Sequence, residues 1–336
     1  MRKLLKNLNK YTIALSALSA AALTNADILT SVRPLGFIAS SIADGVTKTQ
    51  VLIPAGASPH DYNMKPSDAK RVRDAEFVLW IGKDIDAFLE KSIAQRDATS
   101  VLTISKLAGI ESLLGETSAH DHDHDHDHDH DHDHDHDHDH DHDHDHDHDH
   151  DHDHDHDHHH STNELEQDWH VWFSPKISEQ VAEQLAQQLT QLYPQHQAKI
   201  ATNLETFKQQ LTTTNQQITQ QLAEFKDQGF YVFHDAYRYF ENAYGLQQTG
   251  YFTINPLIAP GAKKLAKIKE EINEHKVKCL FAEPQFTPKV LQTLQQSTNV
   301  KIGQLDPMGE KIALGKGSYS AFLQQIAKDF SDCLKN

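Results

Sequence analysis

The sequence predicts an α/β protein of two βαβ lobes with parallel-rich sheets, joined by a single long α-helix. Two observations lead to this fold class. Short apolar runs alternate with amphipathic helical patterns in both halves of the 336-residue chain, as is typical of parallel sheets. Between the halves, a helical pattern runs from Pro194 to about Phe225 with no Gly and no further Pro, which suits a connector between lobes. A turn at Thr212-Thr213-Thr214, which would split this pattern into two helices, is the alternative.

The N-terminal half contains three predicted strands and four predicted helices. Gly45 ends the first helix, and Pro54 and Gly56 stop the second strand. Ser67 is suited to cap the second helix, and the apolar run FVLWI predicts a buried third strand. We predict strands at residues 28–32, 50–53 and 77–81, and helices at residues 35–44, 67–74, 85–93 and 175–192.

The same alternation of strands and helices resumes after the connector. We predict strands at residues 230–233, 250–254, 277–281 and 300–305, and helices at residues 237–243, 261–275, 288–297 and 318–334. Parallel sheets bind ligands at the carboxyl ends of their strands. Polar residues at those ends are therefore the first candidates for a site.

A run of alternating His and Asp extends from His120 to His160 and holds 22 His and 19 Asp. It contains no apolar residue, so it cannot bury surface to offset the entropy of ordering, and we predict a solvated, disordered loop. The run also carries nearly all of the formal net charge of −18. Because the rest of the chain is near neutral, it lacks the basic face that nucleic-acid binding requires.

The N-terminus has the pattern of a secretory signal peptide over residues 1–26. An apolar stretch at residues 11–23 is too short to span a bilayer, and small or polar residues precede a predicted cleavage after Ala26. The basic residues that flank this stretch are Arg2, Lys3, Lys6 and Lys10. We therefore predict an exported, soluble protein.

The chain has two cysteines, Cys279 and Cys333. Two thiols in an exported chain usually pair, and we predict a disulfide that ties the last helix to a strand of the C-terminal lobe. It would close a loop of about 55 residues and contribute roughly 4 kcal/mol of stability. Two unrelated buried thiols are the alternative.

Five His lie outside the run. His60, His170 and His234 lie where a strand or loop ends, whereas His196 and His275 lie in polar helical patterns and are expected on the surface. Three imidazoles suit zinc, with a fourth tetrahedral position left open. Because their spacing matches no local zinc motif, three structural His residues remain the alternative.

Several carboxylates follow predicted strands or ligand candidates. Asp306, in GQLDPMG, would bind metal or orient an imidazole, or else would begin a turn before Pro307. Asp61 and Asp235 directly follow ligand candidates and would accept hydrogen bonds from them, or act as turn and cap residues. Glu283, before Pro284, is a further candidate of the same kind.

The segments GASPHDYNMKPSDAK, DWHVWFSP, FHDAYRYFE, AEPQF and LDPMG occur in this order, with the His/Asp loop between the first two. Together they resemble the ZnuA-type periplasmic zinc-binding proteins, the solute-binding components of ABC importers, over essentially the whole mature chain. The resemblance implies a zinc cleft between two lobes, with His60, His170 and His234 as ligands. Manganese-binding relatives usually carry a carboxylate at the position of His234, so a third imidazole favours zinc.

One departure from this family bears on the metal ligands. Some zinc-binding relatives have Glu immediately before the first ligand His, where this chain has Pro59. The fourth ligand is therefore open between Asp306 and water. The pair Cys279 and Cys333 matches the disulfide of this subgroup.

The resemblance also implies partners and a domain division. The protein would be a periplasmic monomer that delivers Zn²⁺ to the membrane permease of an ABC transporter, which works with its ATPase. The expected divisions are a signal peptide (1–26), an N-terminal lobe (27–115), the His/Asp-rich loop (116–164), the end of the N-terminal lobe (165–193), the connecting helix (194–226) and the C-terminal lobe (227–336).

The run from His120 to His160 is interpreted as an accessory zinc collector. Each neutral imidazole is a metal ligand, but a floppy loop loses entropy when it closes on a metal, so its sites should be weaker than the cleft. A repeat expansion that merely solvates a linker is the alternative.

Other functional classes compete with zinc transport. Three imidazoles and an open zinc position also suit a zinc-dependent hydrolase, but the sequence has no HExxH motif and no evident general base. We therefore do not expect an enzyme. A surface adhesin and a metal buffer without a transporter are the remaining alternatives.

Overall fold

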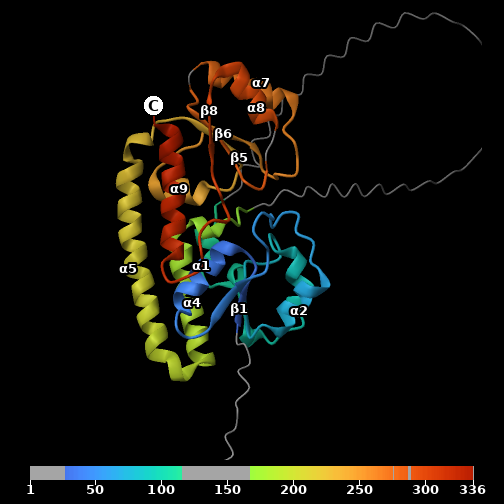
Figure 1. Cartoon of the computed structure of the whole chain (residues 1–336), viewed down its shortest axis with the longest axis vertical. Helices are drawn as coiled ribbons and strands as arrows, with labels where there is room; N and C mark the ends of the chain where they lie inside the picture. The colour runs from blue at the N-terminus through green and yellow to red at the C-terminus, as the bar shows by residue number, and fades with distance from the viewer. Residues whose placement is uncertain (1–26, 116–166, 275, 287–288, 336) are drawn as a thin grey trace, which may run out of the picture.

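The computed structural model describes residues 27–115, 167–274, 276–286 and 289–335. These residues form two lobes, each built on a four-stranded parallel sheet, which a long helix joins (Figure 1). The predicted α/β fold class is therefore confirmed. The predicted signal peptide, the run from His120 to His160 and His275 lie outside the described residues.

The N-terminal sheet has the strand order β2-β1-β3-β4, and every neighbouring pair is parallel. Its strands are β1 (Asp27–Thr30), β2 (Lys48–Val51), β3 (Phe77–Trp80) and β4 (Val101–Thr103). The helices of this lobe are α1 (Arg33–Ile42), α2 (Pro66–Asp74), the short α3 (Glu90–Ile93) and α4 (Pro175–Leu192). β4 was not predicted from the sequence, because three residues are too few to show the alternation of a strand.

The C-terminal sheet repeats this topology as β6-β5-β7-β8, again with parallel neighbours. Its strands are β5 (Phe230–His234), β6 (Gly250–Thr253), β7 (Cys279–Ala282) and β8 (Lys301–Gln304). The helices between them are α6 (Arg238–Tyr244), α7 (Ala262–Asn273) and α8 (Lys289–Thr298). In both sheets the first strand lies between the second and third. This is the switch point at which open α/β sheets bind ligands.

The connector, α5 (Gln197–Leu222), is one continuous helix, about 39 Å long at 1.5 Å per residue. It runs through Thr212-Thr213-Thr214, so the alternative of two helices is wrong. Asn203 donates from its side-chain amide to the carbonyls of Ile42 and Asp44, at 2.9 and 2.8 Å, and so satisfies the end of α1. The buried stripe of α5 recurs every three or four residues, at Ile200, Asn203, Phe207, Leu211, Thr214, Ile218 and Leu222.

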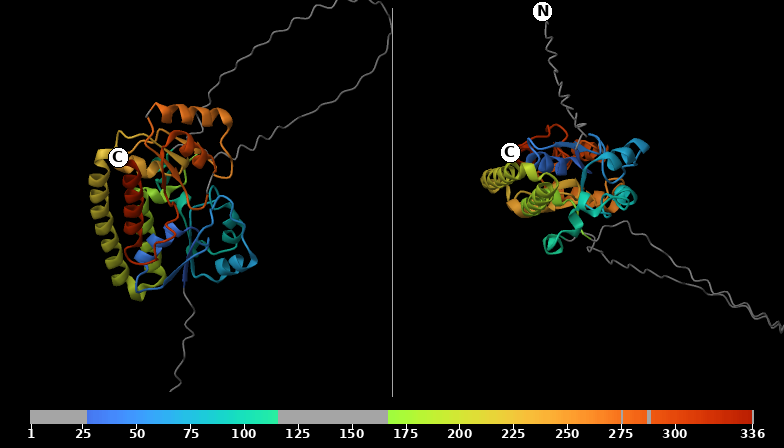
Figure 2. Two further views of the ribbon diagram at one scale, coloured as in Figure 1. Left: turned by 45° about the horizontal axis from the view of Figure 1, so that its top comes forward. Right: turned by 90° about the horizontal axis from the view of Figure 1, so that it is seen from below.

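The last helix, α9 (Ser318–Leu334), lies alongside α5 and contacts both lobes (Figures 1 and 2). The ring centroid of Phe322 is 5.5 Å from that of Phe37 on α1, and Phe330 is 4.9 Å from Phe281 on β7. One hydrophobic cluster therefore includes residues of both lobes. A shared core of close-packed aromatic rings restricts how far the lobes can separate.

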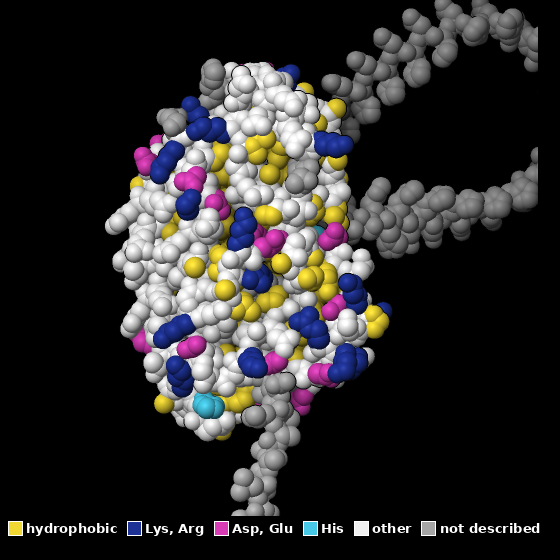
Figure 3. All heavy atoms as spheres, in the orientation of Figure 1, with side chains coloured by type: hydrophobic (Ala, Val, Ile, Leu, Met, Phe, Trp, Pro, Cys, Tyr) yellow, Lys and Arg dark blue, Asp and Glu magenta, His cyan; other side chains and the backbone are white. Residues whose placement is uncertain are grey.

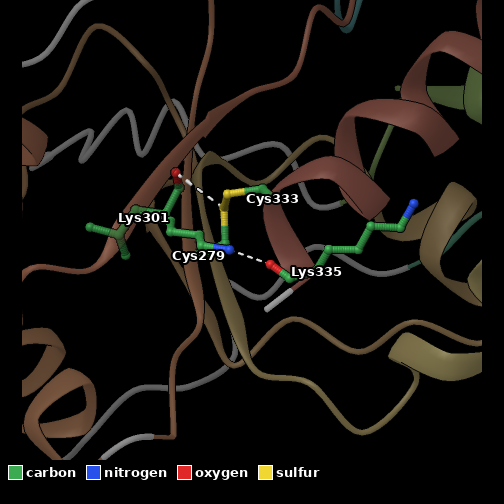
Figure 4. The surroundings of a disulfide bond; sticks show 5 residues. Cys279, Lys301, Cys333 and Lys335 are labelled. Atoms are coloured by element: carbon green, nitrogen blue, oxygen red, sulfur yellow. Dashed lines mark hydrogen bonds between the residues drawn. A yellow bond between two sulfur atoms is a disulfide. The ribbon is translucent and has the colours of Figure 1, made fainter.

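The disulfide joins Cys279 of β7 to Cys333 of α9, with a Cα–Cα distance of 6.0 Å (Figure 4). The predicted pairing is therefore confirmed. Beside it, the Lys301 ammonium of β8 donates to the backbone carbonyl of Lys335, just beyond the end of α9. Both links hold α9 against the C-terminal sheet.

The surface carries mixed charge. On the face in Figure 3, Lys and Arg side chains are interspersed with Asp and Glu, in keeping with the near-neutral composition outside the run. Within the described part of the chain, no helix has both the length and the apolar composition needed to cross a bilayer.

Candidate metal centre

His60 lies on the loop that follows the carboxyl end of β2. Its backbone N–H donates to the Ser58 hydroxyl at 3.2 Å, which forms a local turn. Gly56, at φ +81°, adopts the left-handed conformation that favours glycine, and its N–H donates to the Glu310 carboxylate of the opposite lobe at 2.7 Å. The loop is therefore held by its own turn and by the facing lobe.

His170 immediately precedes a short 3-10 helix (Val171–Phe173) that leads into α4. Its ring Nδ1 lies 2.7 Å from the Asp168 carboxylate, which also accepts the His170 backbone N–H at 2.9 Å. A carboxylate accepts hydrogen bonds, so Nδ1 carries the ring proton and the lone pair of Nε2 is free to bind a metal. Asp168 therefore sets both the orientation and the tautomer of His170.

His234 is the last residue of β5, at the carboxyl end of the second sheet's switch strand. Its Nδ1 lies 3.4 Å from the Glu283 carboxyl group, which also accepts a hydrogen bond from Tyr237 at 3.1 Å. The ring is buried, and among the described residues its Nε2 has no hydrogen-bond partner. A buried polar atom of this kind is costly unless a ligand satisfies it.

The three imidazoles converge from far-apart segments. Their candidate ligand atoms all lie within 4.8 Å of one another, and the Nε2 atoms of His60 and His170 are 3.4 Å apart. Two nitrogens bound at about 2.0–2.1 Å to a tetrahedral zinc ion would be separated by roughly 3.4 Å. The arrangement therefore fits a shared zinc ion without rearrangement of these two rings.

The electrostatics of the site favour the neutral forms of His60 and His234. Burial, with the nearby His234 and His170 rings, holds the pKa of His60 well below its ordinary value. Burial and His170 lower the pKa of His234 in the same way, although Asp235 opposes the shift. At neutral pH the His60 and His234 rings therefore keep lone pairs for a metal.

Burial raises the pKa of Glu283 to about 8, although its hydrogen bond from Tyr237 opposes the shift. The sequence already marked Glu283 as a further candidate. Its position beside His234 follows from the pairing of β7 with β5. Near neutral pH a carboxyl group with this pKa is largely protonated, so its neutral form does not add charge to the site.

The structure does not bring Asp306 into the cluster. Its carboxylate accepts hydrogen bonds from the backbone N–H groups of Met308 and Gly309, each at 3.0 Å, and of Glu310 at 2.7 Å. This is the turn geometry that the sequence analysis gave as the alternative. These hydrogen bonds hold the Asp306 carboxylate in the turn and away from the three rings.

Two other candidate carboxylates, Asp61 and Asp235, each follow a proposed ligand in the sequence. Asp61 is exposed, and Asp235 is paired with Arg238 at 2.9 Å. Their assignment as acceptors for the ligand rings or as turn and cap residues stays a prediction. The orienting acceptor of His170 is Asp168, which the sequence analysis missed. A signal existed in the segment DWH, because a carboxylate two residues before a His can reach its ring. His196 ends a 3-10 turn outside the cluster.

The cavity between the three rings has a volume of about 10 Å³. This is close to the minimum that holds one water molecule. It is also lined by Trp172, Phe286 and Met308, which limit access by water. The enclosed space beside the rings therefore suits a single small ion.

The chain is similar to known zinc-uptake proteins. A family model described as "ZnuA: Zinc-uptake complex component A periplasmic" matches residues 28–333. The high-affinity zinc uptake system protein ZnuA of Haemophilus influenzae is 60% identical over 338 residues, which cover 99% of each chain.

Solved structures share the fold. The crystal structure of ZnuA has a TM-score of 0.69 at 21% identity and covers 92% of this chain and 99% of that chain. A zinc-bound ZnuA deletion mutant has a TM-score of 0.68 at 21% identity, with 92% and 98% covered. At 21% identity, the two structures support the two-lobe fold alone.

Proposed function

Because this chain belongs to the ZnuA family of periplasmic zinc-uptake components, we propose that it is a periplasmic receptor for Zn²⁺. It captures the ion between its lobes and delivers it to an ABC permease for zinc uptake. The observation that carries this proposal is the convergence of three imidazoles on one small cavity.

The proposed ligands are His60, His170 and His234. Three nitrogen donors favour zinc over manganese, which prefers carboxylate oxygen. The fourth position is taken by water, because the Asp306 carboxylate is engaged by three backbone N–H groups. The unpartnered Nε2 of His234 supports a direct bond to the ion.

The small cavity also favours a receptor over a hydrolase. A zinc hydrolase needs space beside the metal for its substrate, whereas a cavity of about 10 Å³ admits one small particle. The bound zinc is therefore cargo.

The proposed localisation and partners follow from the family. The segment 1–26 acts as a signal peptide that is cleaved after Ala26, and the mature chain works in the periplasm with a membrane permease and its ATPase. All three proposed ligands come from one chain, which supports action as a monomer. The run from His120 to His160 is proposed as an accessory collector with weaker zinc sites.

The proposal is tested by zinc titration of a chain without residues 120–160, in competition with a chelator. This deletion removes the accessory His, so only the cleft remains. We expect one tightly bound zinc per chain and loss of tight binding when His60 or His170 is replaced by Ala. A deletion variant that folds but binds no zinc tightly would refute the cleft as the capture site.

A further inference from the structure

Gly115 and Asp168, which flank the segment 116–166 in the sequence, are joined in a hydrogen-bonded neck beside His170. The Asp168 N–H donates to the Gly115 carbonyl at 3.1 Å. The Tyr239 hydroxyl accepts from the Gly115 N–H at 3.0 Å and donates to the Asp168 carbonyl at 2.6 Å. One side chain therefore bonds both sides of the neck.

This hydroxyl also crosses between the lobes. Tyr239 belongs to α6, which follows His234 in the C-terminal lobe, whereas Gly115 and Asp168 belong to the N-terminal lobe. The Tyr239 side chain is buried, so water cannot easily replace its two hydrogen bonds. The bond to Asp168 thus joins the unit that carries His234 to the segment that carries His170.

Asp168 connects the neck to the metal centre. Its backbone N–H and carbonyl are bonded to Gly115 and Tyr239, while its carboxylate holds the ring and the N–H of His170. A shift of the Asp168 backbone would carry the carboxylate with it. The direction of the His170 Nε2 therefore depends on the neck.

The Tyr239 hydroxyl adds two hydrogen bonds to the neck, where backbone pairing between Asp168 and Gly115 supplies one.

We propose that Tyr239 is a positioning residue for zinc capture. Its hydroxyl holds the neck closed, fixes Asp168 against His170 and couples this arrangement to the lobe that carries His234. The inference rests on the proposed zinc-binding function. Tyr239 does not touch the ion and acts through Asp168.

The test compares Tyr239→Phe with a matched control, Tyr244→Phe, in the full chain. Both residues lie on α6 and are buried, but the Tyr244 hydroxyl donates to Asn215 at 2.6 Å, away from the neck. We expect Tyr239→Phe to weaken zinc binding about tenfold, mainly through faster release, in line with changes to groups that orient metal ligands. Tyr244→Phe should stay within about twofold of the unmodified chain.

Two further measurements separate positioning from general loosening. In a double-mutant cycle with Asp168→Ala, the Tyr239→Phe penalty should shrink, because the variant lacks the carboxylate through which Tyr239 positions the His170 ring. In metal-free protein, the NMR signal of the His170 Nδ1 proton should exchange with water faster in Tyr239→Phe than in Tyr244→Phe.

The outcomes distinguish this inference from the proposed function. Full zinc affinity in Tyr239→Phe, equal losses in both Phe variants, or additive penalties in the cycle would each overturn the positioning role. If the unmodified chain binds no zinc, the proposed function fails instead, and the proton exchange rates still decide whether Tyr239 positions His170.

Discussion

The Nε2 atom of His60 lies 3.4 Å from the Nε2 atom of His170, although 110 residues separate them in the sequence. Two lone pairs that face each other at this distance repel, unless a proton or a cation lies between them. The Nε2 atom of His234, which has no hydrogen-bond partner among the described residues, lies nearby. The fold therefore places ring nitrogens around a space that suits a zinc ion. Zinc capture therefore needs little reorganisation of the His60 and His170 rings.

Replacing His234 with Ala should weaken zinc binding by more than about 100-fold. That is the upper end of the losses seen when only a partner of a metal ligand is changed, and His234 is proposed to bond the metal itself. His196→Ala is the matched control, since His196 lies outside the cluster. Chelator competition on the chain without residues 120–160 measures both affinities, and equal values would remove His234 from the ligand set.

Deleting residues 120–160 should lower zinc stoichiometry without altering the tight site. The run offers many imidazoles on a segment with no apolar residues, so its sites lack the preorganisation of the cleft. By calorimetric titration, we expect the full chain to bind several zinc ions weakly in addition to one tightly bound ion. The deletion variant should bind the tight ion alone. An unchanged stoichiometry would mean that the run does not bind zinc.

Local pattern was enough to predict elements whose signals are strong. The observed bounds of α4 and α9 match those predicted from the sequence, because apolar stripes and helix-end signals coincide there. α2 instead begins at Pro66, so Ser67 is not its cap. The Asp68 carboxylate instead accepts a hydrogen bond from the Lys65 backbone N–H at 2.9 Å and so caps the N-terminus of α2. Proline at the first helical position outweighed the cap signal of Ser67.

The candidate site was predictable where position along a strand mattered, and less so where contacts mattered. His60, His170 and His234 could be marked because each follows or ends a strand or loop. The roles of Asp168 and Asp306 depend on which nearby group hydrogen-bonds to each carboxylate. The periodicity of the sequence does not indicate these hydrogen bonds. The packing of α9 against α1 was equally hidden, because it joins segments from opposite ends of the chain.

Removing the disulfide with Cys279→Ala and Cys333→Ala should destabilise the protein by about 4 kcal/mol. The crosslink spans 54 residues, and the chain-entropy model gives this value for the unfolded state that it restricts. Urea unfolding of the double variant and the oxidised parent measures the difference. An unchanged unfolding free energy would show that the α9 packing alone holds the C-terminal lobe.

Glu241→Gln should flatten the dependence of stability on pH. Burial, with Asp235 adding to it, raises the pKa of Glu241 to about 8. The folded protein therefore holds this proton more tightly than the unfolded chain, so stability falls as pH rises from about 4.5 to about 8 and levels off above that. Gln keeps the shape without a titrating proton.

The unfolding free energy of the Glu241→Gln variant at pH 5 and pH 8.5 measures this effect. We expect a smaller loss between the two values than in the parent, and a more stable variant at pH 8.5. Glu224→Gln, at an exposed position, is the control and should follow the parent. An identical pH profile for Glu241→Gln and the parent would contradict a buried, protonated Glu241.

Anomalous scattering at the zinc edge, from a crystal of the metal-loaded protein, tests the central claim most directly. We predict one strong peak between the lobes, within about 2.0–2.1 Å of nitrogen atoms from His60, His170 and His234, with water as the fourth ligand. A loaded crystal without density at this point, or with an ion bound by fewer than three of these rings, would contradict the account.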